Sequence, residues 1–159
     1  MKDIFINLEN NKFHGEVLDV GILDNTIIKD LCVNNIENER IFYKSRNIRK
    51  SIDTTVLFFS LNLFYTNIFK YRMIKLIHKS MNKNAEVYIW DINKPRKKIF
   101  RKNIKMILPD KTIKSLKINN LNIISDNSFE KIRDLISKFF EIKEIRASDD
   151  VFFIKAVKN

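Results

Sequence analysis

The sequence predicts a single-domain α/β protein with a mostly parallel sheet, helices on both faces and a C-terminal antiparallel hairpin. Two observations carry this prediction. Short runs rich in Val, Leu, Ile and Phe alternate with amphipathic segments of helical period, and the last two runs are joined by a short polar turn. The chain has 159 residues, a length that suits one domain, and we expect residues 1–159 to form it.

The first half of the chain supplies three predicted strands and two helices. Residues 16–21 (EVLDVG) form an apolar run that ends on glycine, which suits a buried strand. Residues 27–32 follow N-cap chemistry with apolar side chains at helical spacing. Residues 40–45 (RIFYKS) alternate weakly and predict a strand, and residues 54–63 predict a central strand. Residues 67–81 then place their apolar side chains on one face of a helix.

The second half supplies three more strands and one helix. Residues 85–92 (AEVYIWDI) predict another buried strand. Residues 129–139 repeat apolar side chains at helical spacing after an Asp-Asn-Ser N-cap signal. Residues 140–147 and 151–157 both alternate, and the turn chemistry of Ser148, Asp149 and Asp150 between them predicts a hairpin.

Several classes of protein are not expected from this composition. The single cysteine, Cys32, excludes a disulfide framework and a multi-cysteine zinc site, and we expect no metal. The longest apolar stretch, residues 54–64, is about half of the ~20 residues that cross a bilayer. Residues 1–12 are polar with mixed charge, which predicts a short helix or arm and no signal peptide. The expectation is a cytoplasmic protein with no membrane partner.

Positive charge is concentrated in one segment, residues 94–117, which we call the basic insert. The formal net charge is +11, and ten basic residues against the single acid Asp110 put +9 of it in this insert. Two interpretations stay open. The insert can face nucleic-acid phosphates or a substrate, or it can be a solvated excursion in a chain whose Lys, Ile and Asn content reflects AT-rich codons. The first interpretation assigns the contact to Lys97, Lys98, Arg101, Lys102 and Lys105.

Four segments of the chain resemble one known family. Residues 15–21 (GEVLDVG) are similar to a first strand and cofactor loop that usually reads VLDVGCGTG. Residues 54–64, with the helix after them, resemble that family's fourth strand. Residues 83–93 (KNAEVYIWDIN) resemble its fifth strand, often KPGGRLYIWD, and residues 140–158 its sixth and seventh. The family is the class I S-adenosylmethionine-dependent methyltransferases, and the resemblance implies their Rossmann-like fold over most of the chain.

The resemblance also implies a cofactor site. S-adenosylmethionine would be held where the first and fourth strands end, by Asp19 and Gly21 on one side. Ser60 and Asn62 stand on the other side, in the place of an Asn-Pro-Pro-Tyr-type motif. Substrate-recognition elements are often inserted after the fifth strand in this family, which is where the basic insert lies.

Two departures from the family pattern leave the function open. Leu23 and Asn25, or Asp24 if the loop shifts by one residue, replace the later glycines of the cofactor loop. Only 32 residues, Ile22 to Asp53, separate the first strand from the fourth, whereas two βα units need roughly 60. One βα unit is therefore expected to be missing, and with it the acidic residue that grips the cofactor's ribose hydroxyls.

Three functional hypotheses follow. The chain is an S-adenosylmethionine-dependent methyltransferase of unknown substrate, or it is a non-catalytic methyltransferase-fold module that binds a partner. Nucleic-acid binding through residues 94–117 is compatible with either. A domain that lacks a βα unit can expose a sheet edge or an apolar face, so a homodimer is a further partner to consider.

Overall fold

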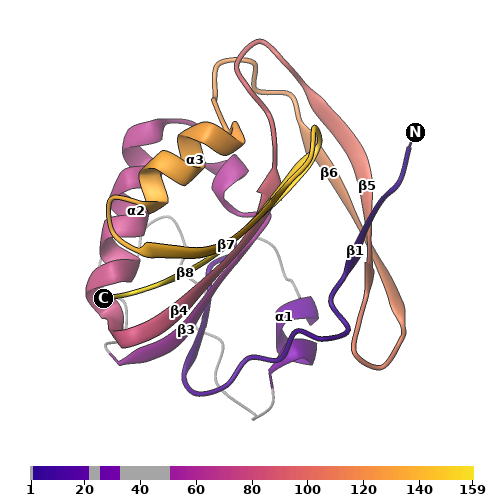
Figure 1. Ribbon diagram of the computed structural model, residues 1–159. Coiled ribbons are helices and arrows are strands. Elements are labelled where there is room, and N and C mark those ends of the chain that lie inside the picture. The colour runs from indigo at the N-terminus through magenta and orange to yellow at the C-terminus, as the bar shows by residue number, and fades with distance from the viewer. Residues whose placement is uncertain (1, 22–25, 33–50) are drawn as a thin grey trace.

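The computed structural model describes residues 2–21, 26–32 and 51–159 (Figure 1). Its strands form a five-stranded main sheet of order β2-β3-β4-β8-β7 and a three-stranded second sheet of order β1-β5-β6. The elements are, in chain order, β1 (Ile4–Asn7), β2 (Val17–Asp19), α1 (Thr26–Leu31), β3 (Ile52–Phe58), the 3-10 helix η1 (Leu61–Leu63), α2 (Asn67–Ser80), β4 (Met81–Ile92), β5 (Phe100–Ile107), β6 (Ile113–Asn120), α3 (Phe129–Ile136), β7 (Glu141–Ala147) and β8 (Val151–Val157).

The main sheet is half parallel and half antiparallel. β2 pairs with β3 and β3 with β4 in parallel, whereas β8 pairs antiparallel with both β4 and β7. The strands expected at 16–21, 54–63 and 85–92 and the C-terminal hairpin are all confirmed, with β3 ending five residues early at Phe58. Six of the seven β3 residues are buried, as expected for a strand covered on both faces.

Two helices, α2 and α3, cover one face of this sheet (Figure 1). The Thr66 hydroxyl caps α2 by accepting a hydrogen bond from the Phe69 amide at 3.4 Å. Ile74 and Ile77 of α2 and Ile136 of α3 are fully buried against the main sheet. The helices predicted from apolar spacing over 67–81 and 129–139 are therefore confirmed, and their apolar stripes form this half of the core.

The opposite face corrects the predicted architecture, which placed helices on both faces. Here the second sheet covers the main sheet together with the short helix α1 (Figure 1). Val56, Phe58 and Trp90 point to this face, because successive side chains of a strand alternate between the two sides. They pack with Ile104 and Met106 of the second sheet in one buried cluster.

The basic insert is the source of this second sheet. Phe100, Ile104 and Met106 face inward and alternate along β5 with more exposed polar side chains. The period of two was masked by the interleaved Lys and Arg, so no strand was expected there. β1 completes the sheet by pairing in parallel with β5, Ile4 opposite Ile104, where a helix or arm was predicted. The strand predicted over 40–45 and the N-cap residues Asp24 and Asn25 lie outside the described residues.

The longest helix in the described part of the chain is α2, with 14 residues. Among the described residues no helix has the length and apolar character that a bilayer crossing requires. Over the same residues, no group of three or more His, Cys, Asp and Glu side chains is placed to hold a metal ion.

Candidate functional site

The carboxyl ends of β2, β3 and β4 meet at one edge of the main sheet, because these three strands are parallel neighbours. Open α/β sheets bind ligands outside this edge. Asp19 is the last residue of β2 and is 3% exposed, opposite Val56 of β3. The Val20 amide donates to the Val56 carbonyl at 2.9 Å, which extends the pairing toward half-buried Gly21. Residues 22–25 of the predicted cofactor loop lie outside the described residues.

Ser60 lies at the same edge, two residues after β3 ends. The preceding residue, Phe59, has a φ of 53° and donates its amide hydrogen to the Trp90 carbonyl at 2.7 Å. A left-handed backbone at a bulky residue costs energy, so packing must enforce this turn. Ser60 is 1% exposed, and its hydroxyl has no hydrogen-bond partner among the described residues. The hydroxyl of Thr55 inside β3 shares this property.

Asn62 points to a different environment, the buried carboxylate of Asp91 at the end of β4. Its amide nitrogen donates to Asp91 at 2.8 Å and to the Phe59 carbonyl at 2.7 Å. Its side-chain oxygen accepts from Asn120 of β6 at 3.2 Å. Both amide hydrogens of Asn62 are therefore donated within the protein. The cofactor contact predicted for Asn62 stays a prediction, and its observed role is to tie η1 and β6 to β4.

Asp91 is the centre of a buried polar network. Beyond Asn62, its oxygens accept hydrogen bonds from the backbone amides of Leu61 at 2.8 Å and of Ile92 at 2.8 Å. The side-chain amide of Asn127 donates to it at 3.2 Å. Burial raises the pKa of Asp91 from 3.8 to about 6, because desolvation of the carboxylate outweighs its donors.

Two buried lysines complete the network. Lys70 of α2 donates to the side-chain oxygen of Asn127 at 2.8 Å, so Asn127 bridges Lys70 and Asp91. Burial lowers the pKa of Lys70 from 10.5 to about 8. Lys94, 1% exposed, donates to the carbonyls of Asn122 at 2.7 Å and Ser125 at 2.8 Å. It therefore holds the loop between β6 and α3, and its pKa is also lowered by burial.

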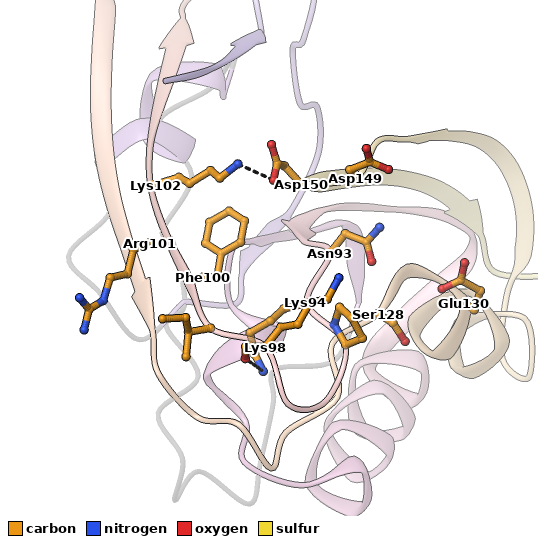
Figure 2. Close-up of a pocket in the computed structure, with 12 residues that line it drawn as sticks. Asn93, Lys94, Lys98, Phe100, Arg101, Lys102, Ser128, Glu130, Asp149 and Asp150 are labelled. Atoms are coloured by element: carbon orange, nitrogen blue, oxygen red, sulfur yellow. Dashed lines mark hydrogen bonds and ion pairs between the residues drawn. The ribbon is translucent and has the colours of Figure 1, made fainter. Parts of the chain in front are cut away.

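A pocket of about 730 Å³ opens beyond the carboxyl end of β4. Figure 2 shows Lys98 on one side of this pocket and Asp149 and Glu130 on other sides. Lys102 closes part of the rim through an ion pair with Asp150 at 2.6 Å. Cationic and anionic groups therefore line different sides of the pocket.

The five predicted phosphate contacts do not form one patch. Lys97 and Lys98 lie in the turn before β5, and Lys98 lines the pocket. Lys102 is paired with Asp150. Arg101 and Lys105 alternate with the inward residues of β5 and so project from the outer face of the second sheet. Figure 2 shows the Arg101 side chain directed away from the pocket.

Sequence reasoning missed two residues on that outer face, Phe5 of β1 and Lys117 of β6. The strand register places Phe5 beside Lys105, and Lys117 beside Asn103. Alternation within β5 and β6 could have identified Lys117. No local signal could have identified Phe5, because its neighbour on the sheet is 100 residues away in the chain.

Comparisons with known proteins place the fold. No family model and no curated protein matches the chain. Solved structures do match. An S-adenosylmethionine-dependent methyltransferase from Methanosarcina mazei is 15% identical over 90% of this chain and 92% of its own, with a TM-score of 0.59. The N-methyltransferase NodS from Bradyrhizobium japonicum is 8% identical over 95% and 89%, with a TM-score of 0.58.

A third structure in this group was solved with the cofactor. The glycopeptide N-methyltransferase MtfA, in complex with S-adenosylmethionine, is 9% identical over 99% of this chain and 92% of its own, with a TM-score of 0.56. At such low identity these matches establish the fold and not the activity. This chain has a class I S-adenosylmethionine-dependent methyltransferase-like fold.

Proposed function

We propose that this chain binds S-adenosylmethionine at the carboxyl edge of β2 and β3 and acts as a methyltransferase-like protein on an acceptor of unknown identity. The observation that carries the proposal is the Ser60 hydroxyl, buried at this edge without a partner in the described part of the chain. A buried hydroxyl that makes no hydrogen bond costs about 1–3 kcal/mol. A polar ligand that supplies the missing partner would recover part of that cost.

The residues present fit such a ligand in part. Gly21 would let the backbone approach it closely, and Ser60 would hydrogen-bond to it. Asp19, nearly buried beneath them, would support the loop that follows β2. Asn62 would act indirectly, by holding η1 against Asp91. When bound, S-adenosylmethionine supplies an electrophilic methyl group, and transfer can rest on positioning of the acceptor without a general base.

Calorimetric titration with S-adenosylmethionine and S-adenosylhomocysteine tests the proposal. We expect binding to the wild-type protein and about tenfold weaker binding to Ser60→Ala, the effect of one lost hydrogen bond. Because this hydroxyl makes no bond in the described structure, the unfolding free energy of Ser60→Ala without ligand should not fall.

Thr55→Val is the matched control. It removes the other unpartnered buried hydroxyl, which lies inside β3 and away from the edge, and should leave binding unchanged. No heat at millimolar ligand, or equal affinity of the wild type and Ser60→Ala, would contradict the proposal. The first result would favour the alternative, a non-catalytic methyltransferase-fold module, which needs no cofactor.

A further inference from the structure

The second sheet has an outer face that packs against none of the core. Its inward side chains, such as Ile104 and Ile118, belong to the buried cluster, and the alternate residues of each strand face out. The registers of β1, β5 and β6 place these outward residues in rows across the three strands. They are Phe5 and Asn7 of β1, Arg101, Asn103, Lys105 and Ile107 of β5, and Ile113, Ser115, Lys117 and Asn119 of β6.

Three cations form a triangle on this face, two on β5 and one on β6. Lys117 lies opposite Asn103, so Arg101 and Lys105 are its two diagonal neighbours on β5. In the described part of the chain, the acid Asp3 lies beside them and pairs with Lys105 at 2.6 Å, and both side chains are partly exposed. Exposed ion pairs of this kind contribute little free energy, so a phosphate can replace Asp3 at Lys105.

An exposed aromatic ring lies beside one corner of this triangle, next to Lys105. Phe5 is 63% exposed, and the Lys105 ammonium lies 5.6 Å from its ring centroid. Asn103, whose amide donates to Asp3 at 3.4 Å, lies between Arg101 and Lys105, and Asn119 lies opposite Arg101, so both add amide groups beside the cations. A sheet face that combines an exposed ring, cations and amides matches the chemistry of unpaired nucleotides, whose bases stack on aromatic rings while phosphates meet cations. A duplex would leave the ring unused, because its bases are already stacked.

We propose that the outer face of the β1-β5-β6 sheet binds single-stranded nucleic acid, with a base stacked on Phe5 and phosphates at Arg101, Lys117 and Lys105. The face is built from residues 4–7, 100–107 and 113–120 and includes none of the residues proposed to hold S-adenosylmethionine. Nucleic-acid binding and cofactor binding can therefore succeed or fail separately.

Fluorescence anisotropy with labelled dT20 and U20, measured over a series of salt concentrations, tests this assignment. Three phosphate contacts predict a slope of log affinity against log salt of about −2. Lys117→Glu should weaken binding and make the slope less steep. Phe5→Leu keeps an apolar side chain and removes the ring, so it should weaken binding about tenfold with the slope unchanged.

Two matched variants control for net charge and for aromatic surface. Lys75→Glu changes the net charge as Lys117→Glu does, on the exposed side of α2, and Tyr71→Leu removes a ring that is 38% exposed on the same helix, across the main sheet from the second sheet. Both should bind dT20 and U20 like the wild type. The proposal is overturned if neither dT20 nor U20 binds at low salt, or if a duplex binds as tightly as they do. It is also overturned if Phe5→Leu and Lys117→Glu bind these oligonucleotides as well as the control variants do. Binding to phosphatidylserine vesicles without binding to either oligonucleotide would also overturn it.

Discussion

At the scale of single residues, the carboxylate of Asp91 is the buried group that depends most on hydrogen bonds from its surroundings. It is fully buried, and backbone and side-chain donors from η1, β4 and the segment before α3 converge on its oxygens. These donors stabilise the carboxylate, yet removal from water still raises its pKa to about 6. The folded protein therefore keeps a proton on Asp91 up to a higher pH than the unfolded chain does.

This pKa predicts a pH dependence of stability. Because the folded pKa lies above the unfolded one, the contribution of Asp91 to stability is most favourable at acidic pH and falls between about pH 4 and pH 6, by up to about 3 kcal/mol. The variant Asp91→Asn lacks this titration. Urea unfolding of both proteins from pH 4 to pH 7 should show the wild type losing stability relative to the variant as the pH rises. A difference that stays constant, or that grows in the opposite direction, would contradict the assignment.

At the scale of elements, the β5-β6 hairpin has two different faces. Its inner side chains complete the core beside Trp90 and Phe58, and its outer face carries three of the insert's ten cations, Arg101, Lys105 and Lys117. The hairpin is also tied to its surroundings by ion pairs from Lys102 to Asp150 and from Lys114 to Asp30. The basic insert is thus a structural part of the fold, whatever its outer face binds.

Two substitutions on this hairpin measure its contribution to stability. Ile104→Ala truncates a side chain with no exposed surface and should lower the unfolding free energy by about 2–5 kcal/mol. Ile113→Ala, at a side chain 61% exposed on the same hairpin, should change it by less than about 0.5 kcal/mol. Equal effects of the two in urea unfolding would mean that the hairpin is a solvated excursion and not part of the core.

The elements also show which parts of the fold could be predicted from sequence patterns. The buried strands, α2, α3 and the C-terminal hairpin were predictable, because each has a period or a turn signal of its own. Asp19 and Gly21 could be placed at the sheet edge because residues 15–21 resemble the first strand and cofactor loop of a known family. The covering sheet was not predictable, since lysines hide the alternation of β5 and β1 carries too few residues to show one. The hydrogen bond from Asn62 to Asp91 was not predictable either, because the two residues are 29 positions apart in the chain.

At the scale of the whole molecule, the free energy needed to open the backbone amides is expected to differ between the strands of the main sheet. β4 lies at its centre between β3 and β8, with Val87 and Ile89 fully buried. β7 is an edge strand whose residues are mostly exposed, Ile145 at 41%. Amides of the central strands should therefore open only with global unfolding, and those of β7 by local opening.

Hydrogen exchange followed by mass spectrometry checks this. Peptides covering residues 85–92 should exchange most slowly and lose protection with the urea dependence of global unfolding. Peptides covering residues 141–147 should exchange earlier and with little urea dependence. β7 that exchanges as slowly as β4 would argue that something covers this edge in solution, such as a second copy of the chain.

The pairing of β1 with β5 has a consequence for how the protein folds during its synthesis. Ile4 finds its partner Ile104 only after the intervening hundred residues have been made. At about 5–20 residues per second, β1 stays unpaired on the ribosome for roughly 5–20 seconds, with apolar side chains exposed. Long-range parallel pairing of this kind also slows folding. The second sheet should therefore form late, and β1 should stay accessible to chaperones or to other chains while translation proceeds.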